Sequence, residues 1–100
     1  MEDACMKLME HMMDSLETAQ GYAMVATKYK MMGDAALTTL YSELSEHEMA
    51  AANKLHNHLM KKANDPAAAA DGRKFYVWGH ERASKKMAEI KMILEDIRRS

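Results

Sequence analysis

This sequence has few of the residues that interrupt helices or build disulfide frameworks. Its 100 residues include one proline, four glycines, one cysteine, one tryptophan and one phenylalanine. The single cysteine, Cys5, excludes an internal disulfide. This cysteine usage is typical of the reducing cytoplasm, where we expect the protein to reside.

Long apolar runs are also missing. No stretch approaches the roughly 20 apolar residues that a membrane-spanning helix needs. The first residues include the acids Glu2 and Asp3 instead of an apolar segment, so we expect no signal peptide. The net charge is −1, and the basic excess of residues 66–100 is spread around a helix. We therefore expect neither a membrane nor a nucleic acid as partner.

What the sequence does contain is typical of an all-α protein. It is 48% hydrophobic and 29% charged, and it is rich in Ala, Met, Leu, Glu and Lys, which favour helices. We expect one domain, residues 1–100, with helices at about 3–32, 35–63 and 66–98. Gly33 is expected to end the first helix and Asp34 to cap the second, while Asp65 and Pro66 begin the third. Connections this short predict an antiparallel three-helix bundle of long helices.

Each predicted helix carries an apolar stripe at helical spacing. The first stripe contains Cys5, Leu8, Met12, Leu16, Ala19, Ala23 and Ala26; the second contains Leu37, Leu40, Leu44, Ala51, Leu55 and Leu59; the third contains Gly72, Tyr76, Gly79, Ala83, Met87, Ile90, Leu94 and Ile97. Glu48 falls in the middle of the second stripe. Gly72 and Gly79 lack side chains, so we expect the third helix to approach a neighbour closely there.

The first helix has a second row of mostly apolar residues. It contains Met6, Met9, Met13, Gln20, Met24 and Met31, and Glu17 lies within it. Three helices of about 45 Å each make a slender bundle whose surface is large relative to its core. Burying the Met row against a second copy would correct this imbalance, so we predict a two-fold homodimer.

Two carboxylates on otherwise apolar rows suggest a metal site. An antiparallel turn at Gly33 places Glu17 near residue 50, within one turn of Glu48, and His47 adjoins Glu48. Carboxylate and imidazole ligands suit iron first, and manganese or zinc as well. A polar patch in a dimer seam, or pairing of both acids with lysines, explains the same residues equally well.

The hairpin resembles the ferritin-like superfamily, most closely the short encapsulated-ferritin type. The resemblance covers Glu17–Tyr22, Asp34–Leu37 and Glu48–Leu55, about half of the chain. It implies a dimer in which helices from two chains complete a four-helix di-iron site. The family motif is a Glu in the first helix and Glu-x-x-His in the second; Glu17 and Glu48 match it, but Ala51 occupies the position of the His. Tyr22 is implied as a donor to the ligands. Short hypothetical proteins of gut bacteria and their phages share the patterns at Ser45–Met49 and Leu55–His56.

Other candidate sites are weaker. Thiol and thioether groups suit Cu(I), but twelve methionines spread along the chain favour core filling over a copper site at Cys5, Met6, Met9, His11, Met12 and Met13. We expect His56, His58 and His80 to be core or surface histidines, and Phe75 and Trp78 to be packing anchors. No nucleophile–base set or phosphate loop is evident. Because the Glu-x-x-His motif is incomplete, we do not expect an enzyme, although ferroxidase-like activity stays open. The leading hypothesis is a small ferritin-like protein that binds a metal, iron first, at the dimer interface through Glu17 and Glu48. The competing hypothesis is a non-catalytic helical interaction module of phage or mobile-element origin.

Overall fold

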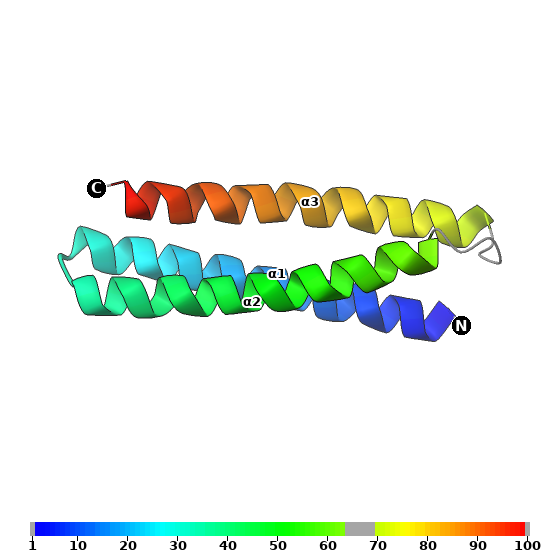
Figure 1. Ribbon diagram of the computed structural model, residues 1–100, viewed down its shortest axis with the longest axis horizontal. Coiled ribbons are helices and arrows are strands. Elements are labelled where there is room, and N and C mark those ends of the chain that lie inside the picture. Colours follow the sequence, from blue (N-terminus) through cyan, green and yellow to red (C-terminus); the bar gives the residue numbers. More distant parts are fainter. Residues whose placement is uncertain (1, 64–69, 100) are drawn as a thin grey trace.

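The chain folds into three helices that lie side by side. The computed structural model describes residues 2–63 and 70–99, and the side chains of residues 6–62 and 77–99. The helices are α1 (Glu2–Met31), α2 (Ala35–Ala63) and α3 (Ala70–Arg98), and the Cα trace measures 53 × 19 × 14 Å. Figure 1 shows α1 and α2 joined by a tight turn, with α3 running along both. The described residues contain no strand, so the prediction of an all-α chain is confirmed.

The turn between α1 and α2 is formed by the two residues that the sequence indicates. Gly33 has φ of 79°, a left-handed conformation that glycine adopts without steric cost. Its N–H bonds the carbonyl of Lys30 at 3.0 Å, and the N–H of Asp34 bonds the carbonyl of Tyr29 at 3.0 Å. This hydrogen-bond pair is the Schellman motif that ends helices. The Asp34 carboxylate then accepts from the N–H of Leu37 at 3.0 Å, which caps α2.

The seam between α1 and α2 is built from small side chains. Ala19, Ala23 and Ala26 of α1 are fully buried, and Ser45 of α2 is fully buried beside them. The Ser45 hydroxyl donates to the Ala19 carbonyl at 2.7 Å, so this polar group is satisfied inside the core. Small residues on both helices allow the backbones to approach closely enough for that bond.

The predicted stripes of α1 and α3 are confirmed where side chains are described. The buried members are Met12, Leu16, Ala19, Ala23 and Ala26 of α1, and Ala83, Ile90 and Leu94 of α3. Gly79 is also buried, and a methyl group built on it would lie 2.9 Å from the sulfur of Met9. The close approach predicted at Gly79 is thus present, with a methionine of α1 filling the space. The side chains of Cys5, Gly72, Phe75 and Tyr76, and the predicted turn and helix start at residues 64–69, lie outside the described part of the chain.

The predicted stripe of α2 is confirmed at its C-terminal end, where Leu59 is buried and Leu55 packs against the core, but nearer the turn it is wrong by one residue. The buried positions are Ser42, Ser45, Ala52 and Leu59, whereas Leu40 is 46% exposed and Ala51 is exposed. One residue is a rotation of about 100° around the helix axis. The core takes the serine–alanine side of α2 because the alanines of α1 leave room only for small side chains. The larger leucines therefore flank the seam.

None of the helices in the described segments is long and apolar enough to cross a bilayer.

Candidate functional site

Glu17, the predicted metal ligand of α1, lies in the groove between α1 and α3. Its side chain is exposed, and it lines this groove together with Met13, Arg82, Lys85 and Lys86. The Arg82 guanidinium lies 4.8 Å from the ring centroid of Trp78, which lines the same groove. Cationic side chains thus gather on the α3 wall opposite the Glu17 carboxylate. Glu89 lines the groove as well. The cationic neighbours compete with a metal ion for the Glu17 carboxylate.

Glu48, the predicted ligand of α2, lies on another side of the bundle. Glu46 forms an ion pair with Arg98 of α3, so position 46 faces α3. Glu48 follows two residues later, about 200° around the helix, and therefore points away from α3. It is half-buried, while its neighbour His47 is exposed. The structure does not bring Glu17, His47 and Glu48 together within one chain.

Among the described side chains, no three His, Cys, Asp or Glu residues are grouped as a metal site would require. The predicted site, however, is completed by a second chain. The inter-subunit metal site therefore stays a prediction, with Glu48 as its most enclosed residue.

Glu48 belongs to a face of the α1–α2 hairpin that α3 leaves uncovered. We call it the outer face, and it consists of Leu37, Leu40, Leu44, Glu48 and Ala51 of α2 with Tyr22 and Tyr29 of α1. Its leucines and tyrosines are half-buried or, for Leu40, exposed. The ring of Tyr41 lies between the two α1 tyrosines, with centroid distances of 6.0 Å to Tyr22 and 5.6 Å to Tyr29. This packing holds the aromatic end of the outer face in place.

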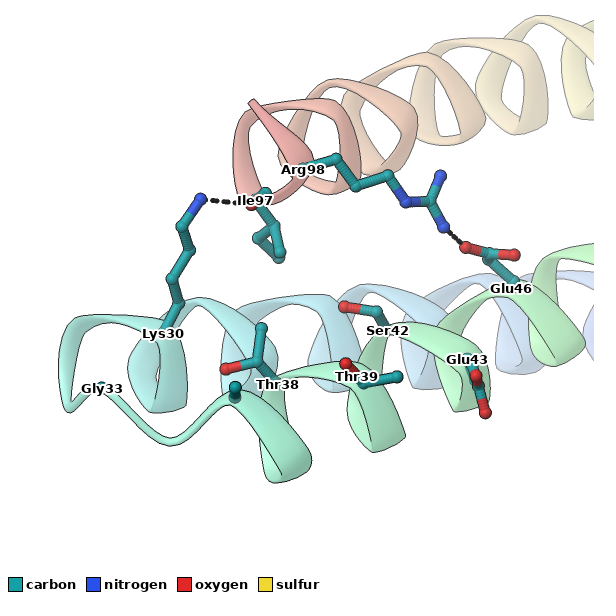
Figure 2. A pocket seen from close by; sticks show the side chains of 10 residues that line it. Lys30, Gly33, Thr38, Thr39, Ser42, Glu43, Glu46, Ile97 and Arg98 are labelled. Carbon is teal, nitrogen blue, oxygen red and sulfur yellow. Dashed lines mark hydrogen bonds and ion pairs between the residues drawn. The ribbon is translucent and has the colours of Figure 1, made fainter. Parts of the chain in front are cut away.

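Figure 2 shows a polar cleft at the opposite side of α2, where the end of α3 meets the turn. Lys30 of α1 donates to the carbonyls of Ile97 and, at 3.2 Å, of Asp96, which lie in the last turn of α3. A cation there offsets the partial negative charge of the helix end. The Arg98–Glu46 ion pair closes the cleft on the α2 side. These contacts fasten the end of α3 and leave no free cation pair for an anionic ligand among the labelled side chains.

Ser42 lies in the wall of this cleft and, unlike Ser45, does not satisfy its buried hydroxyl group. Its hydroxyl oxygen is buried and has no hydrogen-bond partner. An unsatisfied buried hydroxyl costs roughly 1–3 kcal/mol. A serine here is therefore tolerated for its size, since it occupies a seam position next to helix α3.

Two methionines of the proposed copper cluster are core residues. Met12 is fully buried and Met9 is 6% exposed, and both belong to the hydrophobic core. Met13 packs against this core from its edge, while Met6 is 49% exposed. Packing accounts for Met9 and Met12 as the sequence indicates, and the Cys5 side chain lies outside the described residues.

Sequence reasoning missed a contact between two histidines. The Nε2 atom of His56 in α2 and the Nδ1 atom of His80 in α3 face each other in direct contact. The rings are stacked, with centroids 4.6 Å apart and planes 22° from parallel. Each histidine alone looks like an ordinary half-exposed residue. Only the register between α2 and α3 pairs them, and the sequence contains no local signal for that register.

Comparison of the chain with protein-family models, curated proteins and solved structures finds no significant match in any of the three, so the ferritin-like resemblance stays a prediction.

Proposed function

We propose that this protein is a non-enzymatic helical module that acts as a homodimer joined through the outer face of its α1–α2 hairpin. The observation that carries the proposal is that α2 has two apolar sides. One side, with Ser45, Ala52 and Leu59, is buried within the chain. The other side presents Leu40, which is 46% exposed, and the half-buried Leu44, and α1 contributes the half-buried Tyr22 and Tyr29. A helix with a second apolar side is typical of an interaction surface.

The charges of α2 favour a second copy as the partner. Apart from Glu46, which pairs with Arg98, residues 35–48 contain the acids Glu43 and Glu48 and no Lys or Arg, whereas residues 49–63 contain Lys54, Lys61 and Lys62 and no Asp or Glu. An antiparallel pair of α2 helices places each acidic half against a basic half. Within one chain, the two halves of α2 already lie against α1, which runs antiparallel to it. A two-fold axis near Glu48 would place the acidic half of α2 against the basic half of α2 in a second chain.

The proposed dimer also specifies which residues of the two chains would bind a metal ion. A two-fold axis near Glu48 brings two Glu48 carboxylates together, with two His47 imidazoles beside them. Carboxylates and imidazoles suit iron, manganese or zinc. Glu17 lies outside this interface, in the α1–α3 groove. With Ala51 in the position of the family's histidine, we propose at most a binding site, with iron as the first candidate, and no ferroxidase reaction.

Replacing Leu40 and Leu44 together by glutamate is expected to convert the dimer to a monomer. Two leucines that become fully buried in an interface contribute roughly 1.5–3 kcal/mol each, so we expect the dimer dissociation constant to rise at least about a hundredfold. Light scattering coupled to size-exclusion chromatography, over a range of protein concentrations, measures this constant. Circular dichroism checks that both chains stay helical.

A matched control places charge on another exposed apolar position. Met24→Glu changes a side chain that is 61% exposed and lies outside the outer face, so the dimer should persist. A wild-type protein that is monomeric at about 100 μM contradicts the proposal. Loss of the dimer in Met24→Glu but not in the double variant would place the interface on the Met row of α1 instead.

The metal hypothesis has its own test in the tag-free dimer. Fe²⁺ or Mn²⁺, added without oxygen, is expected to raise the unfolding temperature of the wild type, because an ion that binds the folded state stabilises it. The unfolding temperature of Glu48→Gln should not change. Glu43→Gln is the control, because Glu43 is an exposed acid on the same helix. Equal stabilisation of wild type and Glu48→Gln would exclude Glu48 as a ligand.

A further inference from the structure

We infer that His56 and His80 form a two-histidine site for a borderline divalent transition-metal ion, which joins α2 to α3 within one chain. This site is separate from the outer face and from Glu17, His47 and Glu48. It rests on the pairing of two imidazole nitrogens from different helices. Imidazole is the nitrogen ligand that zinc, nickel and copper prefer in proteins.

The geometry needs only a small adjustment to accept an ion. In the metal-free pair one facing nitrogen carries a hydrogen and donates it to the lone pair of the other. Zinc–nitrogen bonds of about 2.0–2.1 Å at a tetrahedral angle place two ligand nitrogens about 3.3 Å apart. The rings must therefore separate slightly, and the donating ring must move its hydrogen to its other nitrogen.

The surroundings of the pair suit a cation. The described positions one turn before and after each histidine are Ala52, Asn53, Leu59 and Met60 on α2, and Val77, Ala83 and Ser84 on α3. None of them carries a charge, so no lysine or arginine lies one turn away to repel the ion. Met9 of α1 approaches the neighbouring Gly79 and is uncharged as well. Both histidines are half-buried, which leaves solvent to complete the coordination of the ion.

The protonation state of the pair favours metal binding near neutral pH. Burial lowers the pKa of His56 below its usual 6.5, and the nearby His80 lowers it further, while a hydrogen bond with Asn57 opposes both. A metal ion binds the unprotonated imidazole.

Zinc titration of tag-free protein tests the site. At pH 7.5, calorimetry with zinc chloride on the Glu48→Gln variant, which lacks the proposed dimer ligand, is expected to give one ion per chain and a rise in unfolding temperature. His56→Gln and His80→Gln should each weaken zinc binding at least tenfold, because a single imidazole remains. Glutamine keeps hydrogen-bonding groups at these half-buried positions, and circular dichroism verifies that both variants fold. His58→Gln, which changes an exposed histidine two residues from His56, should bind zinc like the wild type.

The test also separates this site from the proposed dimer. Because both ligands come from one chain, the Leu40→Glu, Leu44→Glu variant should bind zinc with unchanged affinity whether or not the wild type dimerises. Wild-type protein that binds no zinc at pH 7.5 overturns the inference and leaves a hydrogen-bonded histidine pair. Undiminished binding in both glutamine variants overturns it too, and assigns the ion to other residues.

Discussion

Replacing Ser45 with leucine is expected to destabilise the protein by about 3 kcal/mol, the upper end of the usual cost of overpacking a core. Ser45 is fully buried, and its hydroxyl lies 2.7 Å from the Ala19 carbonyl across the seam of α1 and α2. Leucine adds carbon atoms where the two backbones are closest and removes this hydrogen bond. Chemical denaturation at equal protein concentrations measures the loss, because the proposed dimerisation would make apparent stability depend on concentration.

Two controls separate the size of the side chain from its chemistry. Ser45→Ala removes the hydroxyl without adding volume, so it should cost only about 1 kcal/mol, the worth of one hydrogen bond. Ser84→Leu makes the same serine-to-leucine change at an exposed position of α3 and should alter stability by less than about 0.5 kcal/mol. A Ser45→Leu protein as stable as the wild type would mean that α2 can rotate to bury its leucines, and it would contradict the seam described above.

Leu16→Ala is expected to be the other severe substitution, with a loss of about 2–5 kcal/mol. Leu16 is fully buried in the core cluster with Met12 and Ala19 of its own helix and residues of both others. Small neighbours such as Ala19 and Ala23 cannot extend into the space that leucine leaves, so a cavity should remain. Thermal and denaturant unfolding both report the change; a domain of this size shifts its midpoint by roughly 4–8 °C per kcal/mol.

Met24→Ala is the matched control for this truncation. Met24 lies on the same helix but is 61% exposed, so its replacement should change stability by less than about 0.5 kcal/mol. Equal effects of Leu16→Ala and Met24→Ala would show that α1 is buried on a different side from the one described.

The buried side of α1 was predictable although the helix has a second, methionine-rich row, because only the buried stripe is free of charged residues. In α1 the residues from Met12 to Ala26 that repeat at helical spacing are the residues that the core contains. The turn was predictable for a local reason, since Gly33 and Asp34 are a helix-ending and a helix-capping residue in direct succession. Both signals are contained in a few neighbouring residues and need no knowledge of the rest of the chain.

The phase of α2 was not predictable in this way. Periodicity selects the leucine side because leucine is the more hydrophobic residue, whereas the core takes the serine–alanine side because it fits the alanines of α1. Burial of the Ser45 hydroxyl is not destabilising because the hydroxyl donates to the Ala19 carbonyl. That partner is available only when the two helices are aligned in this way. The same limit applies to the site. Glu17 and Glu48 share a height along the hairpin but not a direction, and the His56–His80 contact depends on residues far apart in sequence.

The turn between α1 and α2 determines which side of α2 becomes interior. Only Met32, Gly33 and Asp34 separate the two helices, and hydrogen bonds on both sides of Gly33 hold them. One residue inserted before Ala35 would advance every position of α2 by about 100°. Leu44 would then occupy the place of Ser45, and Glu48 would take the half-buried place of Met49. A change of chain length by a single residue at this turn would thus bury the leucine side of α2 within the chain and move part of its serine–alanine side out of the core.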